Sequence, residues 1–442
     1  MEILIKILQL LLSLSILVIV HEFGHYMAAR IFKTRVEKFY LFFNPWFSLF
    51  KYKIKDTEYG LGWLPLGGYV KIAGMMDESM DKEQMQQPPQ PYEFRSKPAW
   101  QRLIIMLGGV TMNVVLAFVI YIGMLSVFGE EYLPTAEANK YGIVADSLAQ
   151  DFGLRDGDKI LSIDGHVVED FQKIPLTMIL EEAGTVQIMR DGQQMNVKLP
   201  EGAIGKLVKY KSPFFLSVRF PFVVESFAEQ SAGKDAGLMA GDTILGVNGD
   251  MLFYFTEIRD VIKNKQGEEI TLNVKRGNDT LNMAMLVSGE GKIGVWPKQQ
   301  LNDFFTLNEK RYSLVEAVPA GMVKTIDGIG GYLKQLKLLF SPEVKAYESV
   351  GGFITIGSIF PAEWHWESFW RLTAFLSIML AVLNLLPIPA LDGGHVMFLA
   401  YEIITRRKPS DKFMEYAQIA GMVILFSLLI FANGNDVIKL FH

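Results

Sequence analysis

The pentapeptide His21-Glu22-Phe23-Gly24-His25 is the part of the sequence with the clearest capacity for chemistry. Residues four positions apart lie on one face of a helix, so both imidazoles can reach one metal ion. Glu22 stands between them, where a carboxylate can take a proton from an activated water. This HExxH spacing predicts a zinc site with His21 and His25 as ligands and Glu22 as general base, which is typical of a metalloprotease.

A catalytic zinc site of this kind needs a third protein ligand. The chain has no cysteine and six histidines, so any zinc ligand must be a histidine or a carboxylate. Asp392 is the best candidate, because it is a lone carboxylate in an apolar stretch, just past a break at Pro387 and Pro389. His395, three residues later, is the alternative ligand. Asp392 could also be the N-cap of a helix that resumes after the break.

Asn113 is a further polar residue in an apolar stretch, in the run Gly109-Val110-Thr111-Met112-Asn113. Its amide could hydrogen-bond a substrate backbone or a developing oxyanion. The alternative is a hydrogen bond between two helices, with the small Gly109 allowing close approach.

Four apolar stretches must position these residues, at about 3–29, 103–128, 372–404 and 417–432. The first contains the HExxH motif and is long enough to cross a hydrocarbon core of about 30 Å at about 1.5 Å per residue. A cleaved signal peptide is the alternative, but the apolar run is too long and no small-residue cleavage site follows it. We therefore expect a multi-pass α-helical membrane protein with four spans.

Positive charges indicate how the spans are oriented. They follow the first span, precede the second and fill the turn before the fourth, at Arg30, Lys33, Arg35, Lys38, Arg95, Lys97, Arg102, Arg406, Arg407 and Lys408. By the positive-inside rule these regions are cytoplasmic, and both termini and the long middle segment lie on the other side of the membrane. In a Gram-negative cell this is an inner-membrane protein with a periplasmic insert and an active site near the cytoplasmic face. The net charge of −5 gives no indication of nucleic-acid binding.

The middle segment contains an internal repeat, because the sequence at 153–165 recurs in similar form at 237–249. Each copy predicts a turn, a short buried strand and a hairpin, followed by a helical stretch that is clearest at 255–263. An alternating strand pair completes each copy, at 186–189 with 195–199 and at 270–274 with 281–285. These small α+β units are either peptide-binding domains or a β-rich spacer without a ligand.

Taken together, the chain resembles the site-2 protease family, and within it the RseP-like type of bacterial regulated intramembrane zinc metalloprotease. The resemblance covers essentially the whole chain. It rests on HExxH in the first span, Leu391-Asp392-Gly393 in a late span, and repeat units that resemble PDZ domains. It implies that His21, His25 and Asp392 bind zinc, that Glu22 is the catalytic base, and that Asn113 and Asn384 engage substrate or the oxyanion.

The resemblance also implies a substrate class. Family members cleave the membrane-spanning segments of single-pass proteins, such as anti-sigma factors and signal-peptide remnants, after prior trimming. PDZ domains capture extended peptides by strand addition. Here Tyr141-Gly142-Ile143 and Pro221-Phe222-Val223-Val224 replace the usual Gly-Leu-Gly-Phe loop, so a strict preference for free C-termini is not expected.

The family has a membrane-associated β-hairpin that offers a strand edge to unwound substrate, and residues 59–72 match its position. A plain buried hairpin is the alternative. Two other functions compete with the intramembrane protease. One is a non-catalytic PDZ scaffold that binds peptides, and the other is a metalloprotease acting on soluble peptides at the cytoplasmic surface.

These inferences divide the chain into eight parts. They are a first span (1–32), a cytoplasmic loop with the hairpin and a Gln/Pro-rich linker (33–99), a second span (100–128), a first PDZ domain (129–205), a second PDZ domain (206–298), a helical connecting region (299–367), a third span with the Leu-Asp-Gly motif (368–407) and a fourth span (411–434). The helix expected over 313–340 is predicted to lie outside the bilayer or on its surface.

Overall fold

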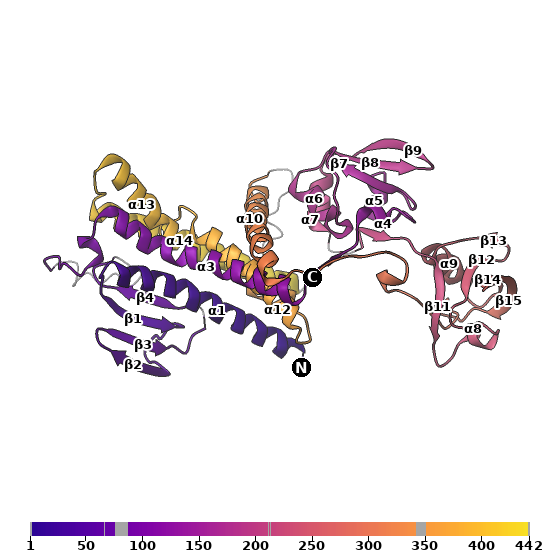
Figure 1. The fold of residues 1–442 in the computed structure, drawn as a ribbon, viewed down its shortest axis with the longest axis horizontal. Helices are drawn as coiled ribbons and strands as arrows, with labels where there is room; N and C mark the ends of the chain where they lie inside the picture. The colour runs from indigo at the N-terminus through magenta and orange to yellow at the C-terminus, as the bar shows by residue number, and fades with distance from the viewer. Residues whose placement is uncertain are drawn as a thin grey trace. The chain divides into compact units, whose positions relative to one another are not determined.

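The computed structural model describes residues 2–65, 67–75, 87–210, 212, 214–341 and 351–440 (Figure 1). Two segments of the expected regions lie outside the described residues. They are 76–86 in the cytoplasmic loop, which includes residue 86 of the expected linker, and 342–350 in the connecting region. The chain forms two compact units. One comprises the residues up to Gly129, Arg311–Phe340 and the described residues from 351 onward, and the other comprises Glu130–Lys310.

The first unit contains four described helices that are long and apolar enough to cross a membrane. They are α1 (Glu2–Ile31), α3 (Ala99–Val127), α12 (Trp366–Asn384) and α14 (Asp411–Leu440), so the expectation of four spans is confirmed. The third is followed by a break at Pro387 and Pro389, which lack the amide hydrogen that a helix needs. The helix resumes as α13 (Asp392–Thr405).

The helices α1 and α3 approach each other at glycines. A Cβ atom added to Gly24 would lie 2.1 Å from the carbonyl oxygen of Gly108, and one added to Gly108 would lie 2.5 Å from the carbonyl oxygen of Gly24. The two backbones are therefore in direct contact, which only glycine on both sides permits. Because Gly24 lies within the HExxH motif, this contact holds the motif against α3.

A four-stranded sheet lies between α1 and α3 in the sequence. Its strands are β1 (Val36–Leu41), β2 (Phe50–Ile54), β3 (Thr57–Leu61) and β4 (Tyr69–Ile72), in the order β2-β3-β1-β4. Strands β2 and β3 form an antiparallel hairpin, β3 runs parallel to β1, and β4 runs antiparallel to β1. The expectation of a hairpin over 59–72 is therefore wrong, because β3 and β4 each pair with β1 and not with each other. This leaves β4 at one edge of the sheet, where it contacts α1. The other edge, β2, carries exposed Phe50, Tyr52 and Ile54 side chains.

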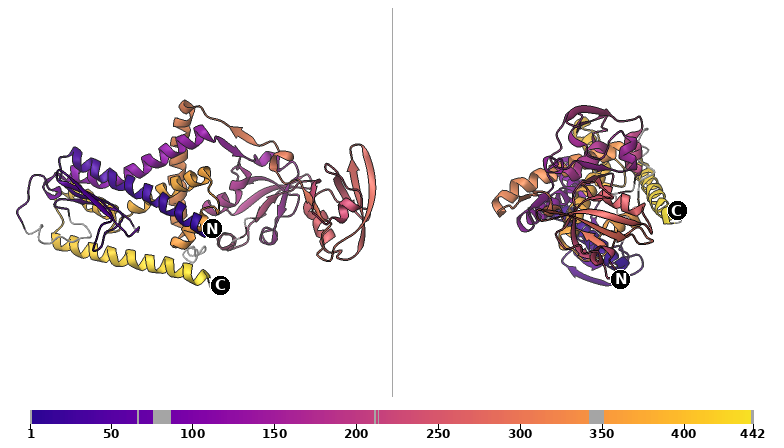
Figure 2. Two further views of the ribbon diagram at one scale, coloured as in Figure 1. Left: turned by 90° about the horizontal axis from the view of Figure 1, so that it is seen from below. Right: turned by 90° about the vertical axis from the view of Figure 1, so that its right-hand side faces the viewer.

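The helix expected over 313–340 is α10 (Leu314–Leu338), and it crosses the spanning helices (Figure 2). Gly321 lies against Ile122 of α3, and Gly328 lies against Ile378 of α12. The helix therefore belongs to the membrane unit rather than to a separate connecting region. A further short helix, α11 (Phe353–Ile359), contacts both α1 and α14.

The second unit consists of two α+β domains joined in sequence. The first contains β5 (Glu130–Tyr132), α4 (Thr135–Ala138), β6 (Ile143–Ala145), α5 (Ser147–Asp151), β7 (Lys159–Ile163), α6 (Ile174–Leu180), β8 (Thr185–Arg190), β9 (Gln193–Lys198), α7 (Ala203–Lys209) and β10 (Leu216–Val218). The second contains β11 (Phe222–Phe227), α8 (Ala232–Asp235), β12 (Thr243–Val247), β13 (Asp250–Met251), α9 (Phe255–Lys263), β14 (Glu269–Arg276), β15 (Asp279–Leu286) and β16 (Val295–Pro297). The expected helix at 255–263 and both alternating strand pairs are confirmed, with β8 paired to β9 and β14 paired to β15.

The repeated Gly-Asp turn has the same ion pair in both domains. Arg190 binds both carboxylate oxygens of Asp158 at 2.7 Å, and Arg276 binds those of Asp242 at 2.8 and 2.6 Å. Both aspartates are buried, and the Arg276 guanidinium holds the pKa of Asp242 below its usual range. A paired and hydrogen-bonded carboxylate can be buried at a turn where an unpaired one could not.

The core of the first domain extends beyond the boundary expected at 205. It includes Leu207 and Leu216, and β10 pairs with β6. Phe305, which follows the second domain in sequence, also packs into this core, and β17 (Asn308–Lys310) pairs with β5. The boundary therefore falls near Arg219, and the chain returns to complete the first domain. The repeat marks where each unit begins, but it does not reveal these long-range pairings.

Replacing Gly108 with alanine tests the contact between α1 and α3. The new methyl group would meet the backbone of Gly24, so we expect a loss of about 1–3 kcal/mol in unfolding free energy, as for other overpacked sites. The midpoint of thermal unfolding of the purified protein in detergent measures this. Gly123→Ala in the same helix is the control, because a Cβ there meets nothing within 4 Å. Equal stability of the two variants would contradict the close contact.

Candidate active site

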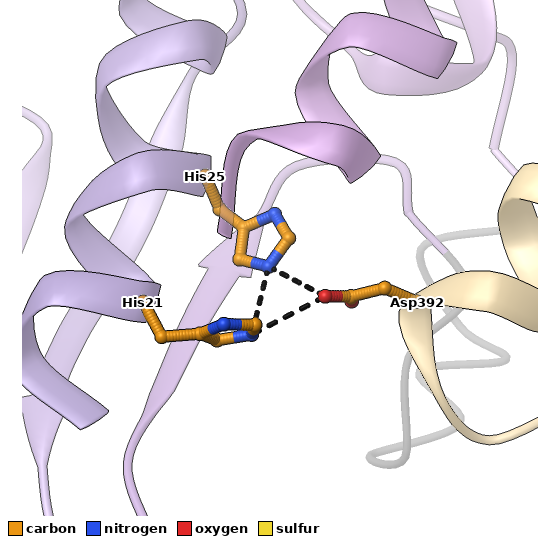
Figure 3. Close-up of side chains that lie close together, drawn as sticks. All are labelled: His21, His25 and Asp392. Atoms are coloured by element: carbon orange, nitrogen blue, oxygen red, sulfur yellow. Dashed lines mark hydrogen bonds and ion pairs between the residues drawn. The ribbon is translucent and has the colours of Figure 1, made fainter. Parts of the chain in front are cut away.

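Three predicted zinc ligands come together although they are far apart in the sequence (Figure 3). His21 and His25 lie one turn apart on α1, and Asp392 is the first residue of α13. The Oδ2 atom of Asp392 lies 3.2 Å from Nε2 of each histidine, and the two Nε2 atoms lie 3.3 Å apart. Among the described residues, these three form a group able to hold a metal ion.

The spacing of the three donor atoms fits zinc. Zinc-to-nitrogen and zinc-to-oxygen distances are about 2.0–2.2 Å, so two ligands of a tetrahedral site lie roughly 3.3 Å apart. The three observed separations of 3.2, 3.2 and 3.3 Å agree with that value. Asp392 Oδ2 is buried and has no hydrogen-bond partner, which is costly unless a cation lies beside it.

The protonation of His25 strengthens this fit. Its Nδ1 lies 2.9 Å from the carbonyl oxygen of Ile105 on α3. A carbonyl oxygen only accepts, so Nδ1 carries a hydrogen, and in the neutral ring that a metal ligand requires, Nε2 presents a lone pair. That lone pair faces the lone pairs of Asp392 and His21, an arrangement that a positive charge between them would stabilise.

Small residues around the donor atoms keep the site open. A Cβ atom on Gly109 would lie 2.4 Å from Nε2 of His25 and 2.8 Å from Nε2 of His21, so a larger residue would fill the place of the metal. On the other side, Gly393 and Gly394 pack against the backbone of the proline-containing loop. The residue before Asp392, Leu391, is the N-cap, and no side chain caps α13. The alternative that Asp392 caps this helix is therefore wrong, and its carboxylate is available to a metal.

The cluster opens into a cavity of about 650 Å³. Glu22 lines the cavity beside the histidines, and Val70 of β4 lines the same cavity. The edge strand β4 forms one wall, and His395 and Gln418 line it elsewhere. A proton acceptor, a metal-ligand group and a strand edge thus share one cavity.

The two candidate asparagines lie on opposite sides of His21. The amide nitrogen of Asn384 lies 3.3 Å from Nε2, the atom that faces Asp392. The amide of Asn113 lies 3.1 Å from Nδ1, on the other side of the ring, and Asn113 is fully buried. His395 borders the cavity but is not part of the three-residue group.

Two residues of this site were not predicted from the sequence. Ile105 contributes only a backbone carbonyl, which no residue type reveals. Gln418 is a buried polar residue in α14, and its place in an apolar stretch could have identified it, because polar groups inside a membrane are rarely without a role.

A bundle of membrane-spanning helices with an HExxH motif and a carboxylate 3.2 Å from both histidines defines the class of membrane-bound metalloproteases. The chain belongs to peptidase family M50, whose family model matches residues 9–428. It is therefore a zinc metalloprotease, and its four long apolar helices make it a membrane protein.

Several relatives match along nearly their whole length. The chain is 28% identical to the regulator of sigma-E protease RseP of Escherichia coli over 459 residues, which cover 97% of this chain and 98% of the relative. It is 27% identical to the regulator of sigma E protease of Haemophilus influenzae, with the same coverage. It is 29% identical to a Neisseria meningitidis protein with zinc metalloprotease in its name, over 98% of this chain and 99% of the relative.

Metal analysis of single variants tests the ligand set. His21→Ala, His25→Ala and Asp392→Ala each remove one donor atom, so we expect the purified proteins to lose most of their zinc. His395→Ala is the control, and we expect it to keep about one zinc per chain because His395 lies outside the group. Elemental analysis after gel filtration measures the ratio. Zinc loss in His395→Ala with retention in Asp392→Ala would identify His395 as the third ligand.

Proposed function

We propose that this protein is an intramembrane endopeptidase that cleaves membrane-spanning segments of single-pass proteins. The observation that carries the proposal is the cluster of donor atoms from His21, His25 and Asp392, 3.2–3.3 Å apart. The cluster shares a cavity with Glu22, and α1, which contributes three of these residues, is apolar enough to span a membrane. Ionisable groups in such a helix are costly, which favours a functional role.

In the proposed mechanism His21, His25 and Asp392 hold zinc and Glu22 is the general base. Zinc, when bound, supplies a Lewis acid that activates water and polarises the scissile carbonyl. Glu22 takes the proton from the attacking water and passes it to the leaving amine. Glu22 and Val70 of the edge strand β4 line the same cavity, so the base lies beside the strand edge.

The strand β4 is proposed to hold the substrate. A transmembrane helix hides its peptide bonds, so cleavage requires an extended segment whose backbone groups find new partners. An edge strand offers a row of such partners. Tyr69, Val70 and Lys71 line the cavity that contains Glu22, so a peptide added to β4 would pass the zinc site. Asn384, on the metal-facing side of His21, is proposed to bind the substrate backbone or the oxyanion.

The two α+β domains are proposed to be PDZ domains that restrict entry to substrates already trimmed on the periplasmic side. The repeat and the exposed edge strand β9 of the first domain support this assignment. Charges beside the spans support a cytoplasmic location for the β1–β4 sheet, with the zinc site near that face. The exposed aromatic and lysine side chains of β2 suit the membrane interface, which supports membrane association of the β2–β3 hairpin.

Glu22→Gln tests the proposed chemistry. The amide cannot accept a proton from water, so cleavage of a single-span reporter protein should fall by about 10²–10⁴-fold. Zinc content should be unchanged, because Glu22 is not a ligand. Gel analysis of the reporter in detergent or vesicles measures cleavage. Full activity in this variant would eliminate Glu22 as the base.

The same reporter assay with the wild-type protein separates the two rival functions. Binding of the reporter without cleavage would favour the scaffold function, and cleavage of soluble peptides alone would favour the surface protease.

Cysteine cross-linking tests substrate binding at β4, and the chain contains no native cysteine. In the Glu22→Gln background, Lys71→Cys should form a disulfide with a cysteine placed near the cleavage site of the reporter. Lys53→Cys, on the exposed strand β2 at the other edge of the sheet, is the matched control. Non-reducing gels report the product. Equal cross-linking at both positions would rule out specific pairing with β4.

A further inference from the structure

We propose that Asn113 is a positioning residue, which accepts a hydrogen bond from Nδ1–H of His21 and so fixes that imidazole for zinc. The inference rests on the proposed zinc site and assigns Asn113 a role different from substrate or oxyanion binding. A group that binds the reacting carbonyl must reach the cavity. Asn113 is fully buried, whereas Asn384 is partly exposed.

The geometry around His21 separates the two asparagines. Asn384 lies at Nε2, the nitrogen that faces Asp392. Asn113 lies at Nδ1, 3.1 Å away, on the opposite side of the ring. The imidazole therefore stands between Asn113 and the metal position, and Asn113 can act on the reaction only through His21.

The direction of the hydrogen bond follows from the chemistry of the ring. A neutral histidine that gives its Nε2 lone pair to a metal carries its hydrogen on Nδ1. That hydrogen needs an acceptor, which on Asn113 is Oδ1. The structure places Nδ2 beside the ring and leaves Oδ1 buried without a partner. Turning the amide over keeps its shape, gives the ring its acceptor and removes the mismatch between two hydrogen-bearing groups.

Asn113 belongs to a stripe on α3 that supports both histidines. Ile105, Gly109 and Asn113 follow one another at intervals of one turn. The Ile105 carbonyl accepts from His25, Gly109 leaves space for the metal, and Asn113 faces His21. The backbone of Asn113 is itself fixed, because Ser377 of α12 donates a hydrogen bond of 2.8 Å to its carbonyl oxygen. The two imidazoles thus have equivalent supports, one from a carbonyl group and one from an amide.

Zinc affinity distinguishes positioning from direct catalysis. Asn113→Leu has nearly the same size but no acceptor, so zinc binding should weaken about 10–100-fold, as for other groups that orient metal ligands. Asn113→Asp retains an acceptor and should bind zinc at least as tightly as the wild type. The full-length protein in detergent is stripped of metal and titrated with zinc against a chromogenic chelator. Cobalt(II) absorption gives a second readout, and its spectrum should change in Asn113→Leu only.

Asn384→Leu is the matched control, because it removes an amide from the other side of the same imidazole. It should impair cleavage while leaving zinc affinity unchanged. Thermal unfolding of the metal-free proteins identifies misfolding. If Asn113→Leu does not fold, Asn113→Asp decides, because an aspartate can accept the bond from His21 but cannot donate to an oxyanion.

Two results would overturn the inference. One is wild-type zinc affinity in folded Asn113→Leu together with lost cleavage in both Asn113 variants, which would make the amide a donor to substrate. The other is loss of zinc affinity in folded Asn113→Asp. Failure of the wild-type protein to bind zinc would instead refute the proposed function, so the two failures are distinguishable.

Discussion

The direct contact of two helix backbones at Gly24 and Gly108 is the constraint on which the active site depends. It brings α3 so close to α1 that an α3 carbonyl reaches His25 and an α3 amide reaches His21. Without it, the imidazoles would have only each other, Asp392 and Asn384 as polar partners. Water cannot replace a lost hydrogen bond inside a membrane. The hydrogen-bond contacts from Ile105 and Asn113 therefore contribute more to holding the imidazoles in place than they would in a soluble enzyme.

The position of Asp392 is fixed by packing at both ends of α13. At the beginning of this helix, Gly421 of α14 contacts the carbonyl of Pro389 so closely that no side chain fits between them. At its far end, Glu402 forms an ion pair of 2.5 Å with Arg102 of α3. The same helix α3 therefore contacts α1 and α13, and it sets the distance between the histidines and the carboxylate.

The second unit, Glu130–Lys310, is stabilised in a different way. Each of its domains is stabilised by a buried aspartate paired with an arginine at the end of a strand, a device repeated in both copies. The segment after the second domain returns to fill the core of the first. The chain therefore enters the second domain from the first and returns to the first, so two segments connect the domains. This double connection suits the proposed role of both domains in controlling substrate entry.

The sequence by itself determined the class of chemistry and the number of spans. Helical spacing is local, so His21, Glu22 and His25 could be assigned to one face, and long apolar runs could be assigned to a membrane. The proline break and the lone carboxylate pointed to Asp392. Only the tertiary structure decided what lies on each side of His21, that β4 is the edge in the cavity, and that the first domain is completed by residues near 305. These are contacts between segments distant in the chain, often through backbone groups, and neither residue type nor spacing records them.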